Sequence, residues 1–279
     1  MFFGSLLFIP LSNIYTQTII VTPNNFHQTG WEEEQINNYP TGQVLVFSTP
    51  YVEIVCGSQE FMDYLHGSVQ MMLPKQQDPT LRRIRLRNNK FDGTLLADIA
   101  TQRNHPGCLQ FSTFITKNRN GSAPDLVLQI DKEGNGDIDY NIVFSPTIQH
   151  QVAATNSGPS FDEVTNYTWQ TWDAASGWWS IGLNEPLPAG LNELFTLSQF
   201  LQLFPDARIR NSRSGENIAG GIRFTIGGDN SDQDNFVGYI DGFRIAKRIN
   251  RNTVKCLLFD FKFPDPSCRF MTLPIEAKI

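Results

Sequence analysis

The sequence predicts an all-β protein, an antiparallel β-sandwich with one short helix. Short runs that alternate apolar and polar residues recur along the 279 residues, and Gly, Pro and Asn turns separate them. Only Leu197–Phe204 has helical periodicity, with Thr196 as a suitable N-cap and Pro205 as a stop. Because the pattern offers no recurrent helices to connect parallel strands, we expect antiparallel layers packed face to face. A β-rich chain of this length needs only one main domain.

The N-terminal segment Met1–Leu11 is apolar and is followed by polar residues. It is too short to span a bilayer but has the length of the apolar region of a secretory signal, although the basic residues that usually precede such a region are missing. We predict an export signal over residues 1–17, and hence a secreted, extracellular or cell-surface protein; the alternative is a first β-strand. No later apolar run is long enough for a membrane helix, so we expect no membrane span in the mature chain.

Each predicted strand is recognised by alternation or by strand-forming residues between turn signals. Residues 109–115 place Phe111 on one face and Phe114, with Gln110 and Ser112, on the other. Residues 95–99 are expected to form a single helical turn or a loop. The predicted strands are residues 17–23, 43–48, 81–86, 109–115, 126–130, 140–144, 165–172, 218–226 and 236–245, and residues 51–56 and 67–73 have strand-like composition.

The charge balance is mildly acidic, with 22 Lys and Arg residues against 28 Asp and Glu residues and a pI near 5.2. Binding to a phosphate backbone requires many clustered cations. The basic cluster Arg82–Arg87 alternates with apolar residues, which is typical of the solvated face of a strand. The sequence therefore predicts no nucleic-acid partner.

The four cysteines, Cys56, Cys108, Cys256 and Cys268, include no C-x-x-C pair, which argues against zinc and thioredoxin-type chemistry. In an exported protein disulfides are expected, whereas four free thiols are the alternative in a chain that is not exported. Because Cys256 and Cys268 bracket a Pro-rich turn, we predict that they pair, which leaves Cys56 with Cys108. The sequence changes character beyond residue 248, so we expect a sandwich over residues 18–248 and a disulfide-containing tail over 249–279 packed on it.

Several segments carry a resemblance to a known family. They are Val21–Trp31, Gln129–Asp131 with Val143–Pro146, Trp169–Asp173 with Trp178–Trp179, and Asp234–Asp241. In this order they resemble a group of secreted bacterial jelly-roll β-sandwich proteins of mostly unassigned function. Many of these end in a PEP-CTERM sorting segment, and their sandwich is similar to concanavalin-like folds and carbohydrate-binding modules. The resemblance covers residues 19–246 and implies a jelly-roll fold and export. Residues 51–90 and the Cys-containing tail depart from the pattern, which leaves ligand and anchoring open.

The tryptophans are the first candidates for a binding site. On a predicted strand Trp169 shares a face with Thr171 and Asp173 while Trp172 faces the other way, so these indoles cannot form one flat platform. Either the tryptophans fill the core, where an aromatic side chain buries about 150–250 Å², or some stack on sugar rings. The second interpretation predicts a polysaccharide or glycan partner. Its candidate ligand-binding residues are Trp178, Trp179 and Trp169.

Two acidic loops are candidates for a structural Ca²⁺ ion, the predicted cofactor. Residues 131–139 resemble the first part of an EF-type loop, with oxygen-bearing side chains at alternate positions and Gly136 at the turn. Ile142 stands where such a loop needs its bidentate Glu, so an acidic hairpin without a metal is the alternative. The second loop is Asp229–Asn235 with Asp241 on the following strand, for which the alternative is a polar turn. The predicted metal ligands are Asp131, Glu133, Asn135, Asp137, Asp139 and Asp241.

No catalytic motif is present. The four histidines are scattered, and neither G-x-S-x-G nor H-E-x-x-H occurs. Glycoside hydrolysis requires two converging carboxylates, for which Glu163, Asp173 and Glu185 are the candidates near the tryptophans, but such side chains are more often simply solvated. We predict no catalytic residues and a secreted, non-enzymatic carbohydrate-binding protein or a component of the cell surface or extracellular matrix. The alternatives are a structural fibre or coat subunit and a polysaccharide-degrading enzyme.

Overall fold

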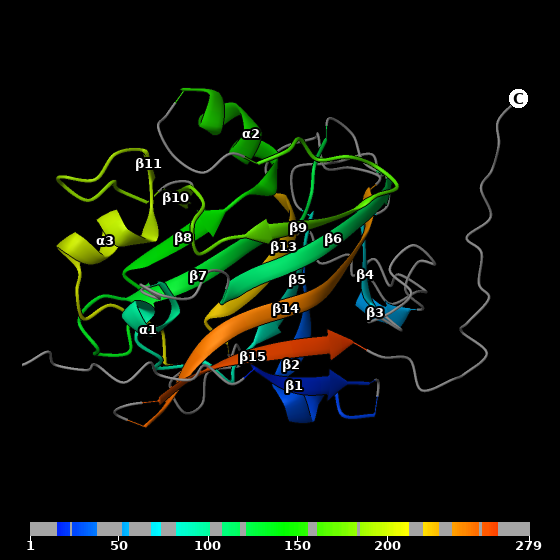
Figure 1. Ribbon diagram of the computed structural model, residues 1–279, viewed down its shortest axis with the longest axis horizontal. Helices are drawn as coiled ribbons and strands as arrows, with labels where there is room; N and C mark the ends of the chain where they lie inside the picture. The colour runs from blue at the N-terminus through cyan, green and yellow to red at the C-terminus, as the bar shows by residue number, and fades with distance from the viewer. Residues whose placement is uncertain are drawn as a thin grey trace, which may run out of the picture.

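Two β-sheets are stacked face to face in the computed structural model of the chain (Figure 1). Neighbouring strands are antiparallel except for one pair at a sheet edge. The predicted all-β sandwich is confirmed. The structure describes residues 16–22, 24–37, 52–55, 68–73, 82–100, 108–117, 121–155, 161–182, 185–211, 220–228, 236–250 and 253–261.

The seven-stranded sheet is organised around its longest strand, β14. Its strands are β1 (Thr16–Val21), β3 (Val52–Val55), β4 (Ser68–Leu73), β6 (Leu109–Lys117), β9 (Trp169–Asp173), β14 (Phe236–Asn250) and β15 (Thr253–Phe261). One edge of β14 pairs with β6, which in turn pairs with β9. The other edge pairs with β4 in its first half and with β15 in its second. The sheet therefore forks into a β4–β3 branch and a β15–β1 branch.

Asp241 and Gly242 lie at this fork. Ile240 is the last residue of β14 paired with β4, and Phe243 is the first paired with β15. Gly242 has a φ of 61°, in the left-handed region that glycine adopts without strain. The buried Asp241 carboxylate accepts hydrogen bonds from the backbone N–H groups of Gly242 (2.6 Å) and Phe261 (3.2 Å). Asp241 thus joins the β15 branch to β14 where the regular pairing is interrupted.

The eight-stranded sheet lies behind the first in Figure 1. Its strands are β2 (Trp31–Asn37), β5 (Arg82–Asn88), β7 (Asp125–Asp131), β8 (Tyr140–Phe144), β10 (Trp179–Ile181), β11 (Leu194–Phe195), β12 (Arg208–Ile209) and β13 (Ile222–Gly228). The sequence did not predict β2, because its acidic run shows no apolar alternation. In the sheet, Glu32 lies opposite Arg87 of β5, so opposite charges stabilise the pairing.

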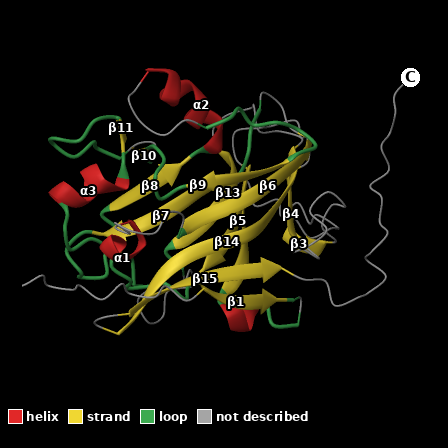
Figure 2. Ribbon diagram, viewed as in Figure 1, coloured by secondary structure: helices red, strands yellow, loops and turns green. Residues whose placement is uncertain are grey.

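Three short helices are described at the periphery of the sandwich: α1 (Leu96–Ala100), α2 (Pro146–Thr155) and α3 (Leu197–Leu203), together with the 3₁₀ turn η1 (His27–Thr29) (Figure 2). α3 confirms the predicted helix, and Thr196 and Gln199 form a reciprocal capping box at its start. α1 is fixed to the end of β14 by Arg248, which donates to the Asp98 carboxylate. Hydrogen bonding to this carboxylate raises the pKa of Arg248.

α2 is a helix that the sequence analysis missed. It begins with a proline, which suits the first position of a helix, but its polar residues outnumber its apolar ones. Only Ile148 and Val152 mark an apolar stripe at helical spacing, too little to predict a helix. The prediction of one short helix was therefore incomplete.

The core lies between the two sheets and is rich in phenylalanine. Trp31 of β2 is fully buried, and its ring lies 5.4–6.3 Å from four phenylalanine rings, centroid to centroid. One belongs to the same sheet and three to the opposite sheet, so a single aromatic cluster joins the layers. Each such ring pair stabilises the fold by about 0.5–1.5 kcal/mol beyond the contribution of the surface area that it buries. The four phenylalanine rings around Trp31 are those of Phe224, Phe243, Phe259 and Phe261.

A disulfide joins Cys108 to Cys256, which corrects the predicted pairs Cys56–Cys108 and Cys256–Cys268. Cys108 directly precedes β6, and Cys256 lies on β15, so the bond crosses the intervening strand β14. The backbone N–H of Ala246 on β14 donates to the carbonyl of Cys108 (2.8 Å) at this point. Proximity across the Pro-rich turn was a poor guide because Cys256 belongs to a strand of the sheet.

The sandwich also continues beyond Arg248, where we predicted it to end, because β15 lies between β14 and β1. The predicted export segment 1–17 overlaps the first two residues of β1, so a signal that leaves this strand whole has to end by residue 15. Of the helices described, none combines the length and apolar character needed to cross a bilayer. Several predicted features lie outside the described residues: residues 1–15, the strand 43–48, the loop Asp229–Asn235, Cys56 and Cys268.

Candidate functional site

The structure buries all three tryptophans that were predicted to contact a ligand. Trp179 has no exposed surface, and Trp169 and Trp178 are each 7% exposed. Trp179 also donates its Nε1–H to the carbonyl of Ala174 (2.9 Å). A ring that stacks on a sugar has to present one face to solvent. The prediction that Trp178 or Trp179 stacks on a sugar ring is therefore corrected: both rings are buried, and Trp179 belongs to the core between the sheets.

Gln149 of α2 fixes the backbone next to Trp179. Its fully buried amide accepts a hydrogen bond from the N–H of Trp178 (3.0 Å) and donates one to the carbonyl of the same residue (2.9 Å). At Gly177 a side chain has no room, since a Cβ there would lie 2.2 Å from the ring of Phe144. This end of the Trp-rich stretch, defined as residues 165–181, is a packed structural element.

Trp172 and Trp169 lie on opposite faces of the seven-stranded sheet, as the alternation predicted. Trp172 belongs to the main core and donates its Nε1–H to Thr113 Oγ1 (2.8 Å). Trp169 packs on the outer face with Phe114 and Tyr239, which stand beside it on β6 and β14. The ring centroids are 5.5 Å apart for Trp169 and Phe114 and 6.1 Å apart for Phe114 and Tyr239. We call these three side chains the outer aromatic row.

Polar side chains flank the outer aromatic row on the same face. At one end of the row, Gln70 of β4 donates to the Tyr239 hydroxyl (2.9 Å). Beside the row, Ser112 and the exposed Thr171 share a hydrogen bond (2.8 Å). Amide, hydroxyl, carboxylate and guanidinium groups on one sheet face can hydrogen-bond sugar hydroxyls. Beyond Ser112 and Thr171, the next paired residues on these strands are Asp173 of β9, Gln110 of β6 and Arg244 of β14.

Tyr167 is an exposed aromatic residue at the rim of this face. It lies just before β9, and its side chain is 66% exposed. Its φ of 61° is the one left-handed value for a non-glycine residue in the part of the chain that the structure describes. This conformation costs a bulky L-residue about 1–2 kcal/mol. The Tyr167 N–H donates to the carbonyl of Ile115 (2.7 Å), next to Phe114. A strained and exposed aromatic residue of this kind points to function.

Gln170 of β9 holds the loop that carries Tyr167. Its Oε1 accepts from the N–H of Thr165 (2.6 Å), and its Nε2 donates to the carbonyl of Glu163 (2.7 Å). On the other side of the loop, His150 Nε2 lies 3.7 Å from Glu163 Oε1. These contacts fix the loop without burying the tyrosine ring.

The carboxylate of Asp131 organises the predicted calcium loop from within. Its Oδ1 accepts from the backbone N–H groups of Glu133 (3.1 Å), Gly134 (2.6 Å) and Asn135 (3.1 Å), and its Oδ2 accepts from Gly136 (2.6 Å). Burial raises the pKa of Asp131, but the four backbone hydrogen bonds together outweigh burial, and the pKa is lowered from its ordinary value. The loop therefore closes around a negative charge of its own.

Three of the other predicted ligands, Asp139, Asn135 and Asp241, also accept hydrogen bonds from backbone N–H groups. Asp139 accepts from the backbone N–H of Lys132 (2.8 Å), and hydrogen bonding of the Lys132 ammonium to Asp139 raises the lysine pKa. Asn135 Oδ1 accepts from the N–H of Asp137 (2.8 Å), and Asp241 serves the fork of the other sheet. Within the described ranges no three His, Cys, Asp or Glu side chains are grouped so that they could hold a metal ion. Calcium binding stays a prediction.

The three carboxylates considered for glycoside hydrolysis make separate contacts. Glu163 contacts His150, and Asp173 accepts from the hydroxyl of Ser176 (2.8 Å). Glu185 accepts from the backbone N–H of Asn141 (2.7 Å) and from its side-chain amide. Each carboxylate is engaged by a neighbour of its own, so the described contacts do not assemble a pair for acid–base chemistry.

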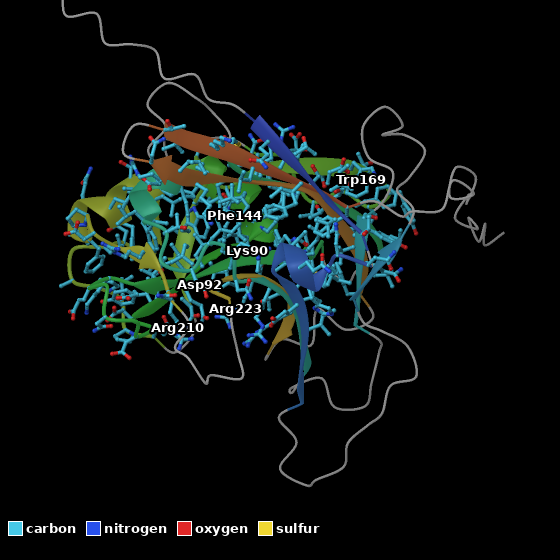
Figure 3. The ribbon with its side chains drawn as sticks, turned by 90° about the horizontal axis from the view of Figure 1, so that it is seen from below. Lys90, Asp92, Phe144, Trp169, Arg210 and Arg223 are labelled. Carbon is cyan, nitrogen blue, oxygen red and sulfur yellow. A yellow bond between two sulfur atoms is a disulfide. The ribbon has the colours of Figure 1, made fainter. Side chains whose placement is uncertain are left out.

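The outer face of the eight-stranded sheet is polar but closed. Arg223 and Gln129 both donate to Asn141 Oδ1 (2.5 and 3.3 Å). Arg87, which we predicted on a solvated face, is 4% exposed, and Arg223 is 7% exposed. Figure 3 shows Arg223 on the lower layer and Trp169 on the upper one. Since Arg87, Gln129 and Arg223 are buried on this face, the outer face of the seven-stranded sheet is the better candidate.

Sequence reasoning identified Trp169 but missed Phe114, Tyr239 and Tyr167. Phe114 was within reach, because the alternation already placed it on the polar face of its strand, where a large ring indicates a second apolar cluster. Tyr167 carries no comparable signal. Left-handed backbone is usually marked by Gly, Asn or Asp, and a tyrosine gives no hint of it.

No model of a protein family, no curated protein and no solved structure matches the chain. The function therefore has to be argued from the site itself.

Proposed function

We propose that this protein is an exported β-sandwich that binds carbohydrate without cleaving it, through Tyr167 and the outer face of the seven-stranded sheet. The observation that carries the proposal is the 66% exposed tyrosine, held in a strained backbone conformation beside the outer aromatic row. Strain that persists in a surface loop has to be imposed by its surroundings, and such sites are often functional.

The chemistry of the face suits a polyhydroxylated ligand. The apolar C–H face of a sugar ring would stack on Tyr167, an amphipathic ring with a polar tip. Sugar hydroxyls would hydrogen-bond the exposed Thr171 and the neighbouring Gln110 and Asp173. Trp169 and Phe114 would act as a rigid base under the site, because both are buried.

Two further observations support parts of the proposal. The Cys108–Cys256 disulfide favours an oxidising compartment, which is what export would provide. The separate contacts of Glu163, Asp173 and Glu185 favour binding over hydrolysis, since a glycosidase needs two carboxylates within about 5–10 Å of each other across the scissile bond.

The test is retention on a panel of insoluble and gel-embedded polysaccharides, with reducing-sugar release measured in parallel. We expect retention without release, a roughly tenfold or greater loss of affinity in Tyr167→Ala, which is about 1.4 kcal/mol or more, and little change in Tyr167→Phe. Leu187→Ala is the matched control, because Leu187 is also a large, 43% exposed apolar side chain. Unchanged binding by Tyr167→Ala, silence across the panel, or sugar release would each contradict the proposal.

A further inference from the structure

The first strand, β1, forms an edge of the seven-stranded sheet and differs from every other described edge strand. It runs parallel to β15 over Thr16–Val21, and all other pairs of described strands are antiparallel. It is the last strand on its branch of the sheet. Its second edge is therefore not covered by a further described strand.

The side chains of β1 leave this edge accessible. Gln17 and Thr18 are exposed, and Ile20 is 48% exposed. Only Ile19 and Val21 turn toward the core, where Val21 is fully buried. The strand is thus anchored by one face, while its other face is exposed and no further described strand covers its second edge.

β1 also lacks the features that normally prevent strands from pairing at an edge. Proteins protect such edges with charges, prolines, bulges or very short strands. The remaining described edge strands follow this rule: β2 contains Glu32–Glu34, β3 contains Glu53, β9 ends at Asp173, and β11 has two residues. β1, with the sequence TQTIIV, contains no charge and no proline, and half of its residues are β-branched aliphatics.

We propose that β1 is a self-association edge, at which a second copy of this chain pairs antiparallel with the first across a two-fold axis and extends the seven-stranded sheet. A second copy is the occupant that fits best because an uncharged, β-branched strand is complementary to itself. Two β2 edges, by contrast, would bring two runs of three glutamates together. The inference is independent of the proposed carbohydrate site, which lies on a different branch of the sheet.

The self-complementarity of the β1 edge also sets the size of the assembly. An open fibre requires two different adhesive edges on each subunit, whereas an edge that pairs with itself closes at two copies. A six-residue strand is about 20 Å long, so the pairing buries less than the roughly 800 Å² per partner of a standard interface. We therefore expect a dimer that dissociates on dilution in the micromolar range.

The test is sedimentation velocity of the full chain from roughly 1 to 100 µM, around the dissociation constant expected for so small a contact. The wild type should pass from monomer to dimer and stop there. Ile20→Lys and Thr18→Lys each place a charge on the edge strand at an exposed position, and both should weaken the dimer at least tenfold. Leu187→Lys introduces the same charge at a similarly exposed apolar residue in a loop and should dimerise like the wild type.

Circular dichroism and thermal unfolding identify variants that retain the fold, and two separate edge positions keep the test decisive if one variant misfolds. A wild type that stays monomeric over the whole range overturns the proposal. So do edge variants that dimerise as strongly as the wild type, or growth beyond two copies.

Discussion

Two glutamines hold the two ends of the Trp-rich stretch with the same chemistry. Gln149 accepts from the N–H of Trp178 and donates to its carbonyl, and Gln170 accepts from the N–H of Thr165 and donates to the carbonyl of Glu163. The first pair of hydrogen bonds is buried, and the second is exposed. The two amides therefore make alike contacts in opposite surroundings.

Access of water decides what each of the two contacts can do. Where water is excluded, losing the glutamine leaves backbone groups without a partner, so the interaction stabilises the fold. Where water has access, it replaces the glutamine at little cost, and the interaction can only decide where the loop lies. The buried end of the stretch is thus built for stability, and the exposed end, which carries Tyr167, is built for position.

The largest expected effect is that of Trp179→Ala at the buried end. Removing a fully buried indole should cost about 3–5 kcal/mol of unfolding free energy. Trp169→Ala should cost less, because Trp169 packs in a three-ring cluster on the outer face of the sheet and not between the sheets. Urea unfolding followed by circular dichroism measures both. A Trp179→Ala protein that keeps its stability but loses polysaccharide retention would instead make Trp179 a ligand-binding residue, as the sequence predicted.

The second-largest change in stability is expected when the glutamines are replaced. Gln149→Leu leaves the N–H and the carbonyl of Trp178 unpaired in the interior, and we expect a loss of about 2–4 kcal/mol. Gln170→Leu should change stability by less than about 1 kcal/mol, since solvent reaches its partners. It should instead weaken polysaccharide retention, because the Tyr167 loop is released. Equal destabilisation by the two variants in urea unfolding would show that burial is not what separates them.

The sequence predicts those features of the fold that depend on local pattern. Alternation placed Trp172 and Trp169 on opposite faces and Phe114 on the polar face of its strand, and the Thr196 cap located α3. It failed where a partner distant in the chain decides the outcome. The acidic segment β2 is a strand because it pairs with β5, where Glu32 lies opposite Arg87, and Cys256 pairs with Cys108 because both flank β14. The candidate site could be predicted only in part for the same reason. Trp169 stood out in the sequence, but the backbone of Tyr167 is held by a hydrogen bond to Ile115 on another strand, which the sequence does not reveal.

Like the two glutamines, Asp131 accepts hydrogen bonds from backbone N–H groups, but its side chain is charged. Its contribution to stability therefore depends on pH. The folded-state pKa of Asp131 is lowered, so its contribution to stability is fully present above its unfolded pKa, about 3.9, and is lost as the pH falls through the folded value. Asp131→Asn should destabilise the protein by about 1–3 kcal/mol at neutral pH, and the gap to the wild type should close in acid.

The difference in stability between the wild type and Asp131→Asn is measured from urea midpoints between about pH 7 and pH 3. This range covers both sides of the ordinary pKa of the carboxylate. Asp137→Asn removes the same charge from an exposed position of the hairpin and should have little effect. A gap that stays constant with pH would contradict the role given to the charge. A midpoint that rises with added calcium in the wild type but not in Asp131→Asn would support the predicted metal site.

The smallest effect separates stability from function at the exposed end. Tyr167→Gly and Tyr167→Ala both remove the ring, and they differ in that glycine adopts the left-handed backbone freely whereas alanine does not. The glycine variant should be more stable than the alanine variant by about 1 kcal/mol, because the relief of strain exceeds the entropy that glycine loses on folding. Both should lose polysaccharide retention equally, as neither has a ring to stack. If the two variants are equally stable, the strain is not stored at Tyr167; if they differ in retention, the backbone and not the ring makes the contact.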